Sequence, residues 1–135
     1  MKVTYSVRNF MTTDIVTMKS TGTINEAMNL MMNNNIGSVV VTRGGEIVGI
    51  LTERDVVKKC CPSVECTTMT AEEIMSSPPI TIDGGATIGE AADLMAEKEI
   101  RRLLVTEKGK IQGIITERDV MKATLNVFKT LSGIA

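Results

Sequence analysis

Histidine and tryptophan are absent from the 135-residue sequence, and its only aromatic side chains are Tyr5, Phe10 and Phe128. Without histidine, the chain lacks the commonest general base and the commonest metal ligand. With so few aromatic rings and a formal net charge of −1, it has little to stack on bases or to follow a phosphate backbone. We therefore expect no enzyme, no metal site and no nucleic-acid partner.

Long apolar runs are also missing. No stretch approaches the roughly 20 residues that are needed to cross a bilayer. The segment Met1–Phe10 carries Lys2 and Arg8 but has no apolar centre, so it lacks the pattern of a secretory signal. We expect a cytoplasmic protein with no membrane partner.

Cysteine is limited to Cys60, Cys61 and Cys66, which lie close together in the sequence. A zinc site would need a fourth ligand at a suitable spacing, and no histidine supplies it. We expect three ordinary thiols, as is usual inside cells, with a redox switch as the alternative.

The sequence does contain an internal repeat with a period of 64 residues. The two copies align without a gap, so that Met11 falls on Met75. The match is strongest in its last block, where Gly49–Val56 aligns with Gly113–Val120. A gapless match of this length indicates two copies of one supersecondary unit.

Each copy predicts the same order of elements, β-α-β-β-α. The first helix opens with a Thr-x-x-Glu capping box and continues with apolar residues at positions i, i+3 and i+4. Two strands rich in β-branched and aliphatic residues flank a glycine-containing turn, and a second helix follows. The predicted elements are strands at 15–18, 38–42 and 47–51 with helices from Thr23 and after Thr52, and strands at 80–82, 102–106 and 111–115 with helices from Thr87 and after Thr116.

A unit of about 55 residues has a thin core when it is alone. We therefore expect one α/β (α+β) module in which two β-α-β-β-α repeats pack with pseudo-two-fold symmetry. The predicted boundaries are residues 8–61 for the first repeat, 62–70 for a linker, 71–125 for the second repeat and 126–135 for a C-terminal tail.

The block Thr-Glu-Arg-Asp follows the last strand of each copy and carries the candidate chemistry. Thr52 and Thr116 are favoured N-cap residues, and Asp55 and Asp119 lie three residues further on, where a carboxylate can bond back to the cap. Helix capping alone explains the block. The same groups also suit a nucleotide, because a helix N-terminus and a hydroxyl can bind phosphate and a carboxylate can accept ribose hydroxyls. The spacing leaves both interpretations open.

Taken together, these residues resemble the cystathionine-β-synthase (CBS) domain pair. The resemblance rests on the duplicated Gly-x-x-Thr-x-x-Asp block, on the Met-Thr and Met-Ser openings at Met11 and Met75, and on the Thr-Ile-x-Glu-Ala helix starts at Thr23 and Thr87. It spans about residues 8–123. Each motif alone is weak, whereas the duplicated set in this order is specific.

The resemblance implies two clefts between the repeats that bind an adenine nucleotide (AMP, ADP or ATP) or, less often, S-adenosylmethionine. In each cleft the Thr-x-x-Asp block of one repeat would hold ribose and phosphate, and the opening strand of the other repeat would frame the adenine. The implied first set is Ile50, Thr52, Asp55, Pro79, Ile80, Arg101 and Arg102, and the implied second set is Ile114, Thr116, Asp119, Ile15, Val16 and Ser38.

The two implied sets differ most in charge. Arg101 and Arg102 of the first set align with Gly37 and Ser38. Guanidinium groups suit phosphate, so we expect the set with Asp55 to bind multiply charged phosphates more tightly. The alternative is a solvated arginine pair at the end of a strand.

The resemblance further implies a regulatory role as an energy sensor. Because the repeats fill the sequence, we expect regulation of a separate protein and pairing into a homodimer. Val127, Phe128 and Leu131 are candidates to cover the partner, or else their own domain. The alternative function is a structural dimerisation module with weak or empty clefts.

Overall fold

The polypeptide passes twice between two units, so the units do not coincide with the linear repeats. The computed structural model describes residues 5–60 and 64–133. The first unit is Ile15–Pro79, and the second combines Met1–Asp14 with Ile80–Ala135. Both contain the predicted β-α-β-β-α order, which confirms the fold class.

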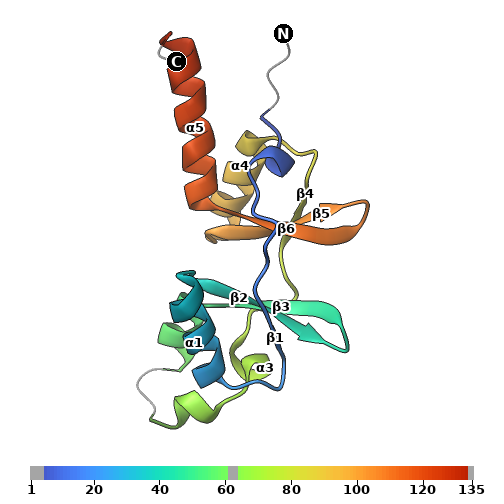
Figure 1. Ribbon diagram of the computed structural model, residues 1–135, viewed down its shortest axis with the longest axis vertical. Coiled ribbons are helices and arrows are strands. Elements are labelled where there is room, and N and C mark those ends of the chain that lie inside the picture. The colour runs from blue at the N-terminus through green and yellow to red at the C-terminus, as the bar shows by residue number, and fades with distance from the viewer. Residues whose placement is uncertain (1–4, 61–63, 134–135) are drawn as a thin grey trace. The chain divides into compact units, whose positions relative to one another are not determined.

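The first unit is built on a three-stranded sheet with helices packed against it (Figure 1). Its first strand lies parallel to the second, which lies antiparallel to the third, in the order β1-β2-β3. The elements are β1 (Thr17–Lys19), α1 (Ile24–Asn34), β2 (Ser38–Arg43), β3 (Glu46–Thr52), α2 (Glu53–Lys59), the 3-10 helix η2 (Val64–Thr68) and α3 (Ala71–Ile74).

The second unit repeats this plan with the order β4-β5-β6 and the same parallel and antiparallel pairings. Its last helix has 15 residues, whereas the equivalent α2 has 7. The elements are the 3-10 helix η1 (Val7–Asn9), β4 (Thr81–Asp83), α4 (Ile88–Lys98), β5 (Arg102–Glu107), β6 (Lys110–Thr116) and α5 (Glu117–Leu131).

Local side-chain chemistry sets where α1 and α4 begin. The hydroxyl oxygen of Thr23 accepts the backbone N–H of Glu26 at 3.2 Å, and that of Thr87 accepts the backbone N–H of Glu90 at 3.1 Å. At α4 the Glu90 carboxylate also accepts the N–H of Thr87, at 3.4 Å. The predicted cap is therefore present at both helices, and the reciprocal bond of a capping box is formed at α4.

Two-residue turns join the long strands of each sheet. Gly44, Gly45, Lys108 and Gly109 have φ angles of 59°, 82°, 52° and 78°. Positive φ at both central residues is the requirement of a type I′ hairpin turn, which matches the twist of the strands. The turn residues identified in the sequence therefore form the two hairpins.

Each unit has an apolar core between its first helix and one face of its sheet. Alternate residues of the two long strands meet helix residues that lie one turn apart. The first core includes Val39, Val41, Leu51, Ala27 and Met31, and the second includes Leu103, Val105, Ile115, Ala91 and Met95.

The last strand of each sheet is bridged by a segment that opens the other linear repeat. Thr12 and Ile114 exchange backbone hydrogen bonds of 2.9 Å each. Ser76 and Ile50 do the same, at 2.9 and 3.1 Å. The Met-Thr and Met-Ser openings are therefore exchanged: each completes the sheet of the unit formed by the other repeat.

The exchanged segments approach so closely that only glycine fits opposite them. A Cβ atom on Gly49 would lie 2.7 Å from the Met75 sulfur and 2.8 Å from the Ser76 carbonyl oxygen. The same atom on Gly113 would meet the segment containing Met11 at equal distances. These two glycines thus admit a neighbouring stretch of backbone.

Two predicted segments acquire structure. Helix α5 extends into the predicted tail, 126–135, and ends at Leu131. The predicted linker, 62–70, contains the 3-10 helix η2, which packs against α1; Pro62 and Ser63 lie outside the described residues. The bounds of the compact units also differ from the predicted repeat boundaries, because each unit includes the bridging segment that opens the other linear repeat.

The expectation of three ordinary thiols needs correction for two of them. Cys60 and Cys66 are paired as a disulfide, with Cα atoms 5.1 Å apart. Both are buried in the first core, where η2 packs against α1. Cys61 lies outside the described residues.

The close approach at Gly49 predicts a stability change. Gly49→Ala should lower the free energy of unfolding by about 1–3 kcal/mol, the usual cost of overpacking. Gly89→Ala in α4 is the matched control: the nearest atom to an added Cβ is 3.7 Å away, and alanine favours a helix by up to about 1 kcal/mol. Urea unfolding should show opposite signs for the two variants. A Gly49→Ala protein as stable as the parent would contradict the tight packing of the bridge.

Candidate functional site

In the first unit the Thr-Glu-Arg-Asp block forms the junction between β3 and α2. The backbone N–H of Asp55 donates to Thr52 Oγ1 at 3.0 Å, and the N–H of Thr52 donates to Asp55 Oδ2 at 3.0 Å. The other carboxylate oxygen, Oδ1, accepts the Ser76 hydroxyl at 3.1 Å and lies 3.8 Å from Lys59 Nζ. Both oxygens of Asp55 therefore have partners inside the unit.

The equivalent block of the second unit has the same cap but a less occupied carboxylate. The N–H of Asp119 donates to Thr116 Oγ1 at 3.3 Å, and the N–H and hydroxyl of Thr116 donate to Asp119 Oδ2 at 2.9 and 3.0 Å. Within the part of the chain that the structure describes, no donor bonds to Asp119 Oδ1. One half-buried acceptor is thus held rigidly and left without a partner there.

The first backbone amide of each helix is already used. Glu53 N–H donates to the Gly37 carbonyl oxygen at 3.0 Å, and Glu117 N–H donates to that of Arg101 at 2.8 Å. These bonds tie each helix start to the residue that precedes the middle strand. A phosphate near either helix could not use this first amide without breaking the tie.

Within each unit, the predicted site residues lie along neighbouring strands. Ser38 is directly opposite Thr52, and Arg102 is directly opposite Thr116. The first unit contains Ile15, Val16, Ser38, Ile50, Thr52, Asp55 and Pro79, and the second contains Ile80, Arg101, Arg102, Ile114, Thr116 and Asp119. Each implied binding set draws on both units, so the two sets remain predictions.

The charge at the start of β5 is partly balanced. Arg101 Nε lies 3.9 Å from Glu117 Oε2, and both side chains are largely exposed, at 74% and 66%. An exposed pair of this kind is weak, because solvent screens it. Arg102 is half-buried and has an interaction partner.

Three residues near the blocks were not identified from the sequence. Lys59 follows Asp55 by four residues on the same helix, a spacing that signals an ion pair. Glu117 lies next to Thr116 in the motif itself. Ser76 is 21 residues away from Asp55, and only the bridge to β3 brings it there.

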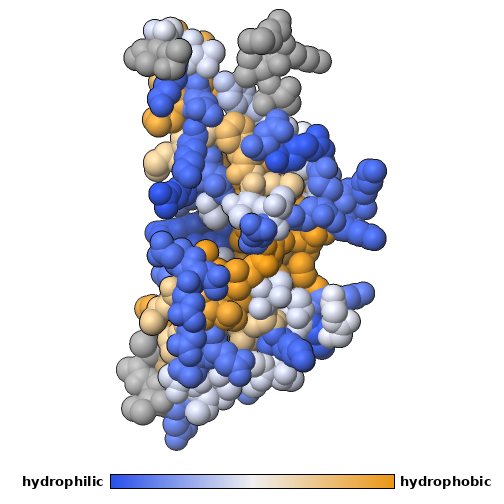
Figure 2. Space-filling model, viewed as in Figure 1, coloured by the Kyte–Doolittle hydropathy of each residue, from blue (hydrophilic) through white to orange (hydrophobic). Residues whose placement is uncertain are grey.

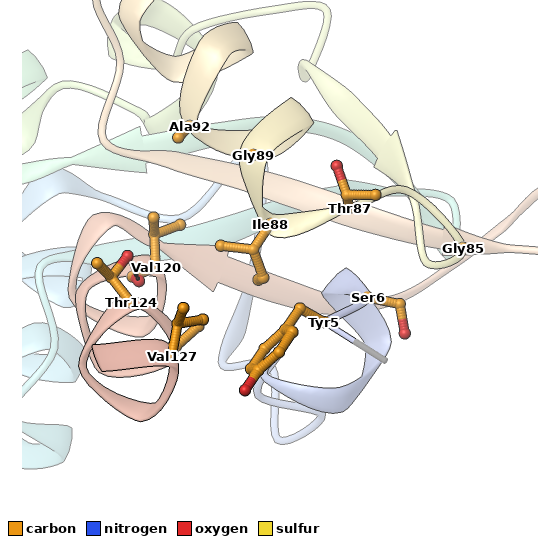
Figure 3. Close-up of a pocket in the computed structure, with 11 residues that line it drawn as sticks. Tyr5, Ser6, Gly85, Thr87, Ile88, Gly89, Ala92, Val120, Thr124 and Val127 are labelled. Atoms are coloured by element: carbon orange, nitrogen blue, oxygen red, sulfur yellow. Dashed lines mark hydrogen bonds between the residues drawn. The ribbon is translucent and has the colours of Figure 1, made fainter. Parts of the chain in front are cut away.

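A groove of about 540 Å³ lies elsewhere in the second unit (Figure 3). In this view Ile88 lies between Val120 and Val127 of α5 on one side and Tyr5 on the other. The remaining lining residues are Ser6, Gly85, Thr87, Gly89, Ala92, Ala123 and Thr124. None of the predicted nucleotide-binding residues lines this groove, and none of its described lining residues is charged. Val127 thus faces its own unit.

Residues 5–60 and 64–133 contain no group of three or more His, Cys, Asp or Glu side chains that could hold a metal ion. No helix in these ranges has the length and apolar character needed to cross a membrane.

A sequence model of the CBS domain matches residues 7–61 and 71–126. The chain belongs to the CBS domain family. CBS domain-containing protein YhcV of Bacillus subtilis is 30% identical over 115 residues, which cover 85% of this chain and 82% of that protein. An uncharacterised protein of Methanopyrus kandleri is 39% identical over 112 residues, 81% of this chain and 57% of that protein. This CBS pair therefore spans little more than half of the second relative.

Solved structures share the fold of this CBS pair. An uncharacterised conserved protein from Pyrococcus horikoshii has a TM-score of 0.83 and 32% identity, covering 92% of this chain and 95% of that one. A candidate signal-transduction protein with CBS domains from Burkholderia ambifaria MC40-6 has a TM-score of 0.78 and 31% identity, covering 84% of this chain and 85% of that one. A hexameric CBS-CP12 protein from bloom-forming cyanobacteria has a TM-score of 0.81 and 27% identity, covering 89% of this chain and 68% of that one.

The cap at the second CBS junction predicts a stability change. Thr116→Ala should lower the free energy of unfolding by about 1 kcal/mol, because the N–H of Asp119 loses its acceptor. Thr116→Ser should retain most of the stability, since serine is an equally good cap. Urea unfolding would distinguish them. Equal stability of the alanine and serine variants would show that the cap does not stabilise α5.

Proposed function

We propose that this CBS pair binds an adenine nucleotide and acts as an energy sensor that regulates a separate protein. The observation that carries the proposal is the Thr-x-x-Asp junction of the second repeat. Its cap occupies Asp119 Oδ2, while Oδ1 has no partner among the described residues. A fixed, half-buried carboxylate oxygen is a suitable acceptor for ribose hydroxyls, since bonds to a charged acceptor are strong.

The proposed ligand would use the two sets implied by the sequence. Asp55 and Asp119 would accept ribose hydroxyls, and Thr52 and Thr116 would bond phosphate or ribose oxygens. Apolar contact to the adenine and further polar contact would come from the rest of the sets, Ile15, Val16, Ser38, Ile50, Pro79, Ile80, Arg101, Arg102 and Ile114.

The two carboxylates are expected to behave differently. A ribose at Asp55 would compete with the Ser76 hydroxyl, whose bond to a charged acceptor is worth about 1.5–3 kcal/mol, whereas Asp119 Oδ1 has no such partner among the described residues. Arg101 and Arg102 favour the Asp55 set instead, because their positive charge attracts phosphate. AMP should therefore favour the set with Asp119, and each added phosphate should shift the balance toward the set with Arg101 and Arg102.

A non-catalytic regulator fits the relatives. YhcV consists mostly of the matched CBS region, and the Burkholderia ambifaria protein is described as a candidate for signal transduction. The same proposal places this protein in the cytoplasm, where adenine nucleotides report energy status. S-adenosylmethionine is the alternative ligand. The alternative function is a structural module with empty sites. The hydrogen bond from Ser76 favours this alternative at Asp55, because it already occupies the carboxylate oxygen that a ribose would use.

The proposal predicts stabilisation by an adenine nucleotide. Thermal unfolding and calorimetry should be measured with AMP, ADP, ATP and S-adenosylmethionine. A ligand at 100 times its dissociation constant should stabilise the native state by about 2.7 kcal/mol. Asp119→Asn and Asp55→Asn should each weaken binding at their own set by about 1.5–3 kcal/mol, because a neutral amide replaces a charged acceptor.

The control for these variants is Asp93→Asn on the exposed side of α4, which should bind like the parent. Asparagine keeps capping capacity, so the site variants should remain folded. No stabilisation of the parent by any nucleotide would favour the structural module, and stabilisation by S-adenosylmethionine alone would change the ligand. A double Asn variant that binds AMP as well as the parent would refute the assigned carboxylates.

We also propose that the protein is a homodimer that uses α5. Met121, Leu125, Phe128 and Leu131 are 66%, 54%, 66% and 79% exposed. The first three have the i, i+4, i+7 spacing of one helix face, and apolar side chains break the polar surface along this helix (Figure 2). A contiguous exposed apolar stripe commonly marks a protein interface. The hexameric CBS-CP12 relative also self-associates.

Phe128→Asp should convert the dimer to a monomer, because a carboxylate would be buried in the apolar contact. Light scattering after size-exclusion chromatography should report twice the 14.6 kDa chain mass for the parent and the single mass for the variant. Asn126→Asp, which adds the same charge on another face of α5, should remain dimeric. A monomeric parent at all concentrations would refute this interface.

A further inference from the structure

We propose that Cys60 and Cys66 form a reversible thiol–disulfide site whose oxidation state controls the order of α2 and, through it, ligand binding at Asp55. The part that concerns α2 stands without a ligand. The part that concerns binding rests on the proposed nucleotide function. The two parts are tested by separate measurements below.

The two cysteines are placed for a disulfide by the path of the chain. Cys60 is the residue at which α2 ends, and Cys66 lies in η2. Their Cα atoms are 5.1 Å apart, within the range that a disulfide requires. Their exposures are 2% and 8%, so the pair belongs to the core of the first unit and links α2 covalently to η2.

Helix α2 depends on such links because its own packing is weak. It has 7 residues, and none of them is fully buried. Val56 packs against the core only in part, and Val57 is 64% exposed. Helices this short are marginal without tertiary support. In contrast, α5 has 15 residues and buries Ala123 to 1% exposure.

Both ends of α2 are attached to the segment that follows η2. Near its C-terminal end, Lys59 Nζ donates to the Ile74 carbonyl oxygen at 3.0 Å. Near its start, Asp55 Oδ1 accepts the Ser76 hydroxyl at 3.1 Å. The disulfide adds a covalent attachment one residue after Lys59. Reduction would remove the covalent attachment to η2 and leave this short helix with the two polar contacts above, the backbone bond of Glu53 and the partial packing of Val56, so its local opening should become more frequent.

The second CBS repeat supplies an internal control. Cys60 aligns with Thr124, and Cys66 aligns with Lys2, so no thiol pair is encoded there. Asp119 is carried by α5, which has its own buried contacts. A redox effect that acts through the thiol pair should therefore change α2 and Asp55 and should leave α5 and Asp119 unchanged.

The reaction is an exchange with a low-molecular-weight disulfide such as oxidised glutathione. One cysteine thiolate attacks a glutathione sulfur, forming a mixed disulfide and releasing one glutathione thiolate. The second cysteine thiolate then attacks the protein sulfur of the mixed disulfide and releases the other. Two protein thiols are oxidised by two electrons, one glutathione disulfide is reduced, and the two thiol protons end on the two glutathione thiols. Local opening of α2 gives the buried sulfurs access to the reagent.

The first experiment needs no nucleotide. Cys61→Ser leaves only the two proposed thiols, and Cys60→Ser/Cys61→Ser/Cys66→Ser is the matched thiol-free control. Peptide mapping across glutathione mixtures from fully reduced to fully oxidised should show that the 60–66 disulfide forms and is reversed. Hydrogen exchange of the amides in α2 should be about tenfold faster in the reduced form, with α5 unchanged. The control should exchange like the reduced form in every mixture.

The oxidised form should also melt about 5–10 °C higher, the shift expected for closing a short loop in a domain of this size. A disulfide that excess reduced glutathione does not open, or one that never forms, would overturn the proposal. Exchange in α2 that is equal in both states would overturn it as well, whatever the protein binds.

The second experiment connects the thiol pair to Asp55. In the Cys61→Ser background, Asp119→Asn leaves Asp55 as the reporting carboxylate, and Asp55→Asn leaves Asp119. AMP should bind the first variant about fivefold more weakly after reduction, the lower end of typical coupling between sites, and the second variant equally in both states. Equal changes at both carboxylates, or none at Asp55, would refute the connection. No AMP binding in any form would refute the proposed function. The hydrogen-exchange measurement would still test whether the thiol pair controls the order of α2.

Discussion

The backbone bridges opposite Gly49 and Gly113 are the contacts on which the rest of the molecule depends. Each bridge brings the segment that opens one linear repeat to the last strand of the other repeat's sheet, and only a residue without Cβ allows that approach. In the first unit the bridge also delivers Ser76 to the carboxylate of Asp55. The same backbone contact therefore completes a sheet and sets the chemistry at the end of the strand.

The two oxygens of the carboxylate in each Thr-x-x-Asp block have different surroundings. One oxygen closes the capping box, which fixes the side chain at the strand–helix junction, and the other faces the surroundings. The surroundings differ between the repeats: Ser76 and Lys59 accompany Asp55, whereas the positions aligned with them hold Thr12 and the buried Ala123. Sequence identity within the motif thus hides a structural difference that arises from residues outside it.

The order of the elements and the caps could be predicted because both are local. Thr23, Thr87 and the glycine-containing turns act through neighbours within a few residues. The exchange of Met11 and Met75 could not be predicted, since a gapless repeat shows which segments are equivalent but not which copy each one joins. The disulfide was missed for a similar reason: a separation of 6 residues permits the pair, and only the packing of η2 on α1 makes it.

The exchange of segments has a consequence for how such a chain could arise. A polypeptide with one repeat would hold a sheet, a glycine at its last strand and a Met-Thr or Met-Ser segment of the kind that here joins the strand of the other copy. Two identical molecules would complete each other by trading these segments, which is a domain-swapped dimer. Fusing two such genes end to end would place both partners on one chain at equal stoichiometry. Each copy could then diverge by itself, as the lone thiol pair and the long last helix of this protein illustrate.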